Sequence, residues 1–206
     1  KKDAHISNET RNRILNAAKE MNYIPNSIAR SLSTNRSGTI GIILPDITNP
    51  FFSEMARAIE DRANKLGYNV MFCDADNKLE KEEKYIELLI GKLVDGVIFI
   101  AGGKSSSSVE KLRNNNIPFV LVDRYVEGYE DCYGVYCLNK EGTSEGMKYL
   151  YEKGKRNIAF VKGPKGLKPS EQRFEGYKDA AIQYGLYNSR LILQGDFTIK
   201  GGMKAT

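Results

Sequence analysis

The stretch "TIGIILPDITNPFF", residues 39–52, decides the fold of this 206-residue chain. Its first half is a short, nearly continuous apolar run rich in isoleucine, which predicts a strand buried on both faces. The next stretch, residues 50–67, is amphipathic, begins at a proline and ends at Gly67, and so predicts a helix. A buried strand followed directly by a helix is typical of a parallel sheet whose faces are covered by helices.

The same alternation continues as far as residue 123. Apolar runs predict three further strands, at residues 68–74, 96–101 and 117–123, with helices between them at 81–93 and 107–116. The fold class expected from this series is α/β, with a parallel sheet.

A second strand–helix series follows an acidic and aromatic linker at residues 125–133. We expect strands at 134–139, 157–164 and 191–197, and helices at about 140–153 and 170–185. We interpret the two series as two lobes, residues 38–138 and residues 139–206, and expect the second to need further strands to be complete.

The N-terminal 37 residues have a different pattern. Residues 8–22 carry apolar side chains on one helical stripe, with Ser7 or Asn8 available as N-cap, and residues 26–34 predict a second, short helix. Seven basic and three acidic residues before residue 41 account for four of the five net positive charges. A local basic patch is typical of a polyanion-binding surface, and a solvated basic end explains the charge alone equally well.

Candidate ligand-binding side chains follow from the rule that open parallel sheets bind ligands beyond the carboxyl ends of their strands. In this chain those positions hold aromatic, carboxylate, amide and arginine side chains: Asp46, Asn49, Phe51, Phe52, Asp74, Asp76, Asp123, Arg124 and Arg173. Two lobes with such edges facing each other would hold a small polar molecule, with the aromatic rings against its carbon skeleton.

These residues also have ordinary structural alternatives. Asp46 and Asn49 are suited to cap the following helix, and the two phenylalanines to fill the core. The aspartates after the second strand are typical turn residues. Arg173 has a glutamate two residues away on either side, which would suffice for a surface ion pair.

The residue content argues against several classes of function. The chain has no nucleophile, zinc-protease or phosphate-loop motif, and its single histidine, His5, lies near the N-terminus, so we expect no enzyme, cofactor or bound metal. Cys73, Cys132 and Cys137 form no CxxC pair, which favours a reducing cytoplasm over a disulfide framework or a zinc site. No run approaches the roughly 18 apolar residues of a membrane span.

Several of these stretches together resemble the lactose-repressor (LacI/GalR) family of bacterial transcription regulators. The resemblance is carried by "YIPNSIARSL" (23–32), "IGIILPDITNPFF" (40–52), "IPFVLVDR" (117–124), "KRNIAFVKGP" (155–164), "QRFEGYKDA" (172–180) and "GDFT" (195–198). It implies two periplasmic-binding-protein-like lobes with flavodoxin-like parallel sheets. These would be preceded by an all-α DNA-binding headpiece remnant and a hinge helix.

The resemblance assigns residues 1–25 to the end of a helix-turn-helix headpiece, whose recognition helix would precede Lys1, and residues 26–37 to the hinge helix and linker. It implies that Leu32 inserts between base pairs in the minor groove, which would kink the duplex. Ala29 would let the hinge helices of a homodimer approach closely, while Arg30 and Arg36 would meet phosphates. The alternative is a linker helix whose leucine packs on the core.

For the cleft between the lobes, the resemblance implies an effector contacted by Phe51, Phe52 and Arg173, with Asp123 and Asp74 as further candidates. One departure concerns Leu138-Asn139, where the family usually has Asp-Asn. The missing acid puts in doubt any cap or interlobe polar contact made there.

The function expected from the resemblance is a cytoplasmic, homodimeric repressor without a membrane partner. Its affinity for operator DNA would be controlled by a sugar, a sugar phosphate or a protein corepressor. The alternative is a periplasmic-type sugar-binding protein of the same architecture, which leaves residues 1–36 unexplained. An enzyme on the same sheet is favoured by no constellation of residues.

Overall fold

The computed structural model describes residues 7–23, 31, 33–34, 36–100, 102 and 105–206. The chain divides into two compact units, Lys1–Ser37 and Gly38–Thr206.

The first unit contains helix α1, Asn8–Glu20. Ser7 is its N-cap, and the Ser7 hydroxyl accepts a hydrogen bond from the backbone N–H of Thr10 at 3.2 Å. This confirms one of the two N-caps expected from the sequence. Residues 31, 33 and 34 are also helical.

The second unit begins with a five-stranded parallel sheet in the order β2-β1-β3-β4-β5. Its strands are β1 (Thr39–Leu44), β2 (Asn69–Asp74), β3 (Gly96–Ile100), β4 (Phe119–Val122) and β5 (Gly134–Val135). The helices between them are α3 (Pro50–Lys65), α4 (Leu79–Gly91) and α5 (Ser107–Asn114). This is the flavodoxin-like order, whose chain reverses direction across the sheet between β1 and β3. The expected α/β class with a parallel sheet is confirmed.

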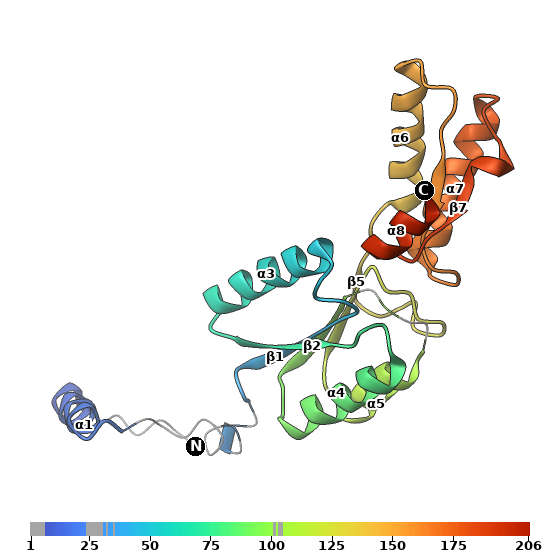
Figure 1. The fold of residues 1–206 in the computed structure, drawn as a ribbon. Coiled ribbons are helices and arrows are strands. Elements are labelled where there is room, and N and C mark those ends of the chain that lie inside the picture. The colour runs from blue at the N-terminus through green and yellow to red at the C-terminus, as the bar shows by residue number, and fades with distance from the viewer. Residues whose placement is uncertain (1–6, 24–30, 32, 35, 101, 103–104) are drawn as a thin grey trace. The chain divides into compact units, whose positions relative to one another are not determined.

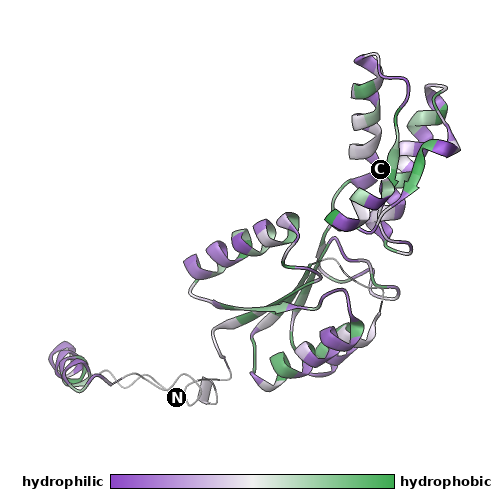
Figure 2. Ribbon diagram, in the orientation of Figure 1, coloured by the Kyte–Doolittle hydropathy of each residue, from purple (hydrophilic) through white to green (hydrophobic). Residues whose placement is uncertain are grey.

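Helices cover both faces of this sheet, α3 on one face and α4 with α5 on the other (Figure 1). Ile42 and Leu44 pack with Ala56 of α3, whereas the intervening Ile43 packs with Ile86 and Leu89 of α4. Hydrophobic residues therefore follow one another along the strands, whereas the helices contain both hydrophobic and hydrophilic residues (Figure 2). The period of two in a strand explains why one continuous isoleucine run supplies both cores.

The second series forms helix α6 (Asn139–Glu152), strand β6 (Phe160–Lys162), helix α7 (Lys168–Gln183), strand β7 (Ile192–Gln194) and helix α8 (Ile199–Ala205). Strands β6 and β7 pair in parallel, and a 3₁₀ turn, Ser189–Leu191, precedes β7. A separate core joins α6 and α7 to this pair through Met147, Tyr177, Ala180 and Ala181.

Two sequence expectations were wrong in detail. The strand expected at 134–139 is only the dipeptide Gly134–Val135, and it pairs with β4 as the edge of the first sheet instead of opening the second series. The segment 125–133 is more than a linker, because Val126 is buried in the first core and Tyr129 packs against it. Val126 and Tyr129 therefore attach this segment to the core of the first sheet.

Helices α6 and α7 approach so closely that Gly176 has no room for a side chain. A Cβ there would overlap the carbonyl oxygen of Lys140, which is backbone and cannot rotate away. We expect Gly176→Ala to lower the free energy of unfolding by about 1–3 kcal/mol through overpacking, measured by urea denaturation. Gly146→Ala is the control, because a Cβ there meets nothing within 4 Å. The control is expected to be neutral or stabilising, and equal stability of the two variants would contradict the prediction.

Candidate functional site

A cavity of about 670 Å³ lies in the second unit, with walls from both strand–helix series. The first series contributes Pro45, Asp46, Asn49, Phe51, Phe52, Asn77, Gly102 and Asp123, and the second contributes Pro164, Lys165, Leu167, Pro169, Arg173, Asp196, Phe197 and Thr198. Its volume is in the range of pockets that bind small molecules, roughly 300–1,000 Å³. Of the effector residues expected from the sequence, Phe51, Phe52, Asp123 and Arg173 all line it.

The turn from β1 into α3 positions one aromatic wall. The Asn49 side chain accepts a hydrogen bond from the Phe51 backbone N–H at 3.1 Å, so its predicted role as helix cap is confirmed. Pro50 and then two phenylalanines in succession follow the cap, and the two rings meet edge to face at 5.3 Å between centroids. Phe52 also packs against the core below, while Phe51 is 46% exposed and free to contact a ligand.

A polar network joins the end of β4 to α6 and α7. The Asn139 side chain donates to Asp123 Oδ1 at 3.2 Å and accepts from Arg173 Nε at 2.7 Å. Arg173 Nη2 also lies 4.0 Å from Asp123 Oδ2. Asp123 is 5% exposed and adopts a positive φ of 49°, a sparsely populated conformation that often marks a functional site. This network therefore holds the acid and the arginine at one wall of the cavity.

A second contact between the two series lies beside this network. The Tyr125 hydroxyl donates to Gln172 Oε1 at 3.4 Å. Burial raises the pKa of the Tyr125 phenol above its usual range.

The segment from β7 to α8 builds a further part of the cavity wall. Asp196 accepts from the backbone N–H and the hydroxyl of Thr198, at 2.9 and 2.7 Å, and these bonds lower the pKa of its carboxyl. Phe197 has a positive φ of 66°, which places its ring over Gly163 and within 5.8 Å of the Arg173 guanidinium carbon. A non-glycine residue in this conformation is strained, so the surrounding contacts must offset that cost to keep the aromatic ring at the cavity.

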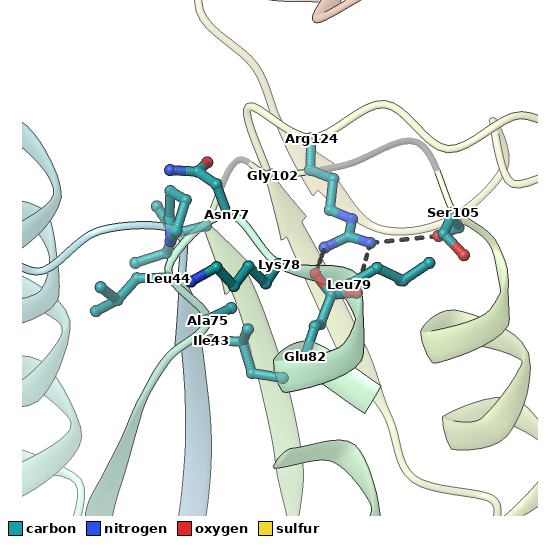
Figure 3. Close-up of a pocket in the computed structure, with 12 residues that line it drawn as sticks. Ile43, Leu44, Ala75, Asn77, Lys78, Leu79, Glu82, Gly102, Ser105 and Arg124 are labelled. Atoms are coloured by element: carbon teal, nitrogen blue, oxygen red, sulfur yellow. Dashed lines mark hydrogen bonds and ion pairs between the residues drawn. The ribbon is translucent and has the colours of Figure 1, made fainter. Parts of the chain in front are cut away.

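A smaller cavity, about 200 Å³, adjoins the first and shares Pro45, Asn77 and Gly102 with it. It lies at the carboxyl ends of β1 and β3, where the sheet order reverses. Its polar wall is an ion pair in which the Arg124 guanidinium donates two hydrogen bonds to Glu82, at 2.8 and 2.9 Å (Figure 3). Arg124 is 1% exposed and lies over the Phe99 ring at 4.5 Å.

The arrangement suits a neutral, hydroxyl-rich molecule. Aromatic rings offer flat apolar faces, and the carboxylate, amide and guanidinium groups offer hydrogen-bond acceptors and donors to ring hydroxyls. Among the described residues no group of three or more His, Cys, Asp or Glu side chains is placed to hold a metal ion. In the same part of the chain, no helix is both long and apolar enough to cross a membrane.

The other predicted site residues fall elsewhere. Asp74 is not among the residues lining either cavity, and its carboxylate accepts from the Asp76 backbone N–H at 3.2 Å, as a turn residue does. Ala29, Arg30 and Leu32 lie outside the described residues. Arg36 is exposed, and its carbonyl accepts from the Thr34 hydroxyl at 3.2 Å.

Sequence reasoning missed several residues of the site, among them Asp196, Phe197 and Asn139. Phe197 lies three residues beyond the end of β7, so the rule about carboxyl ends of strands could have selected it. Asn139 stood in the sequence only as the neighbour of an absent acid. Leu138 indeed makes no side-chain cap for α6, yet the polar contact between the two series is made by Asn139. Only the fold shows this role of Asn139, because its partners Asp123 and Arg173 are 16 and 34 residues away in the sequence.

Comparison with known proteins places the chain in a family. Residues 37–206 match the model described as periplasmic binding proteins and sugar binding domain of LacI family. The chain is 42% identical, over 205 residues, to the ribose operon repressor of Halalkalibacterium halodurans, covering 100% of this chain and 60% of that protein. It is 32% identical over 203 residues to catabolite control protein A of Priestia megaterium, covering 98% and 61% of the two chains. The chain thus spans about 60% of the length of these curated relatives.

A solved structure supports the same assignment. The LacI family transcriptional regulator from Enterococcus faecium with bound ribose is 30% identical, with a TM-score of 0.70. The match covers 81% of this chain and 61% of that one.

Proposed function

The chain belongs to the LacI family, and we propose that it is part of a DNA-binding transcriptional repressor whose operator affinity is controlled by a sugar. In this proposal the two lobes, residues 38–138 and 139–206, hold the sugar between them. No catalytic step is proposed.

One observation carries the proposal: a single cavity combines three aromatic rings with the Asp123–Asn139–Arg173 network. Sugars present apolar C–H faces and ring hydroxyls that each donate and accept, so they need both kinds of wall at once. Arg173 and Asp123 supply a donor and an acceptor whose orientations are fixed by Asn139 before ligand arrives. Pre-organised polar groups of this kind lower the entropy lost on binding.

Among sugars we propose a pentose, with ribose as the first to test. The relative from H. halodurans is named a ribose operon repressor, and the E. faecium regulator was solved with ribose bound. The cavity itself favours a small molecule over a protein corepressor, because a cavity of this size that is lined by aromatic rings is suited to enclose a ligand.

The DNA-binding part of the proposal rests on the first unit. The match to the ribose operon repressor covers the whole chain, so it includes residues 1–36, which a periplasmic-type sugar-binding protein would leave unexplained. Helix α1 would belong to the headpiece and Ala29, Arg30, Leu32 and Arg36 to the DNA contact. We propose that the protein acts in the cytoplasm as a homodimer, since paired hinge helices need a second copy.

Ribose is expected to raise the melting temperature of the full-length protein by several degrees. Saturation at 100 times Kd adds about 2.7 kcal/mol to the free energy of unfolding. Differential scanning fluorimetry with ribose, and with its C2 epimer arabinose as the stereochemical control, measures this. A shift with neither pentose, and with no other sugar or sugar phosphate, would contradict the proposed effector class. Failure of the full-length protein to select any DNA from a random-sequence pool would favour the periplasmic-type alternative.

A further inference from the structure

We propose that Asp95 is a positioning residue for operator binding, which fixes the backbone where the DNA-binding part of the chain enters the first sheet. The inference rests on the proposed function and adds to it a residue outside the effector cavity. It concerns Gly38, the first residue of the second unit.

Gly38 is held by hydrogen bonds to two segments that are far apart in the sequence. Its backbone N–H donates to Asp95 Oδ2 at 2.9 Å, and its carbonyl accepts from the Asn69 backbone N–H at 2.8 Å. The Asp95 backbone N–H donates in turn to the carbonyl of Thr39 at 2.8 Å. Asn69 is the first residue of β2, and Asp95 immediately precedes β3. The two strands that flank β1 in the sheet therefore each provide a hydrogen-bond partner for Gly38, which precedes β1.

The conformation of Gly38 depends on these bonds. Its φ is +67°, which glycine adopts as readily as a negative φ. A Cβ there would meet nothing within 4 Å, so packing does not select this conformation. Among the contacts described, two hydrogen bonds stabilise this conformation: one that Gly38 accepts from the Asn69 backbone N–H and one that it donates to the Asp95 carboxylate. A charged acceptor makes the stronger kind of hydrogen bond, so the carboxylate contributes much of this selection.

The position of the clamp separates it from effector binding. Gly38 and Asp95 lie at the amino ends of β1 and β3, whereas the cavity begins at Pro45, beyond the carboxyl end of β1. A six-residue strand is about 20 Å long, so the two sites occupy opposite edges of one sheet. Loss of the clamp would therefore loosen the backbone at Gly38 without altering the cavity.

The test uses the full-length protein and three variants. The probe is the DNA duplex that the wild-type protein selects from a random-sequence pool, and its affinity is measured by fluorescence anisotropy at one fixed salt concentration. Asp95→Ala is expected to weaken binding about tenfold, since ordering of the entering backbone must then occur on DNA. Asp95→Asn keeps an acceptor oxygen and is expected to restore affinity to within about threefold of wild type.

Asn69→Ala is the matched control. Its side chain reaches the Gly38 carbonyl only at 3.5 Å, and its backbone N–H, which makes the shorter bond, remains. We expect wild-type DNA affinity from this variant. Hydrogen-exchange mass spectrometry supplies a readout that is independent of DNA. Asp95→Ala should speed exchange at residues 37–39 and leave the cavity segments 44–52 and 196–198 unchanged.

Three results would overturn the inference. Wild-type DNA affinity in Asp95→Ala would show that the clamp does not position the DNA-binding part. Faster exchange throughout the lobe would mean that Asp95 only stabilises the fold. Unchanged exchange at residues 37–39 would mean that the clamp does not hold Gly38. A wild-type protein that selects no duplex contradicts the proposed function itself, and is thereby distinguished from a failure of the clamp alone.

Discussion

Replacing Arg173 by alanine is expected to weaken ribose binding at least 100-fold in isothermal titration calorimetry of the full-length protein. Arg173 lines the cavity at 37% exposure and is oriented by its 2.7 Å bond to Asn139. Its removal takes away a charged donor for ligand hydroxyls. It also removes the positive charge that lies 4.0 Å from the Asp123 carboxylate, which is 5% exposed. Loss of charge-assisted hydrogen bonds between the guanidinium and the ligand hydroxyls amounts to about 3 kcal/mol, or two decades in Kd.

Two further variants make this prediction specific. Arg173→Lys keeps the charge but not the planar group that meets Asn139 and Phe197, so it should bind with intermediate affinity. Arg190→Ala removes an exposed arginine that lies outside the cavity, and should bind ribose like the wild type. Wild-type affinity in Arg173→Ala would remove this residue from the site.

Removing Glu82 is expected to destabilise the protein more than any other single change considered. Glu82 is the buried partner of Arg124, with side chains 7% and 1% exposed. Glu82→Ala leaves the guanidinium buried, and among the described residues it keeps the Ser105 carbonyl, at 3.3 Å, and the face of Phe99. Breaking one half of a buried pair costs about 3–5 kcal/mol, which corresponds to a fall in melting temperature of roughly 6–20 °C for a chain of this size.

The control lies on the same helix. Glu87 pairs with Lys111 at 2.7 Å, but the two side chains are 64% and 38% exposed. Exposed pairs contribute about 0–1 kcal/mol, so Glu87→Ala should melt within a few degrees of wild type. The double variant Glu82→Leu with Arg124→Met should recover part of the loss, because it removes both charges together. Equal melting temperatures for Glu82→Ala and Glu87→Ala would contradict the assignment of a structural ion pair.

Local patterns in the sequence predicted most of the elements. The run at 39–44 and the amphipathic stretch after Pro50 both formed what their periodicity indicated, because their side chains need only the general division between core and solvent. The prediction was wrong for residues 134–139, where pairing with β4 leaves only two residues in the ladder. A two-residue strand is too short to show hydrophobic periodicity, and the strand with which it pairs depends on the tertiary structure.

The candidate site shows the same division. The rule that ligands bind at the carboxyl ends of strands found Phe51, Phe52, Asp123 and Arg173, because it needs only the order of strands and helices. It could not distinguish Asp74 from these residues, because Asp74 ends β2 at the same edge of the sheet, but its carboxylate accepts from the Asp76 backbone N–H.

The sequence by itself determined the α/β class, the strands and helices of the first series, and the aromatic and charged residues available at their ends. These follow from hydrophobic periodicity, which acts over a few residues. The tertiary structure decided which of those residues meet: Asn139 between Asp123 and Arg173, Glu82 against Arg124, and Asp95 on Gly38. Each of these contacts joins residues 16 to 57 positions apart. A polar partner at such a separation leaves no mark on local pattern, because it is selected by the geometry of the folded sheet and by the cost of burying a polar group alone.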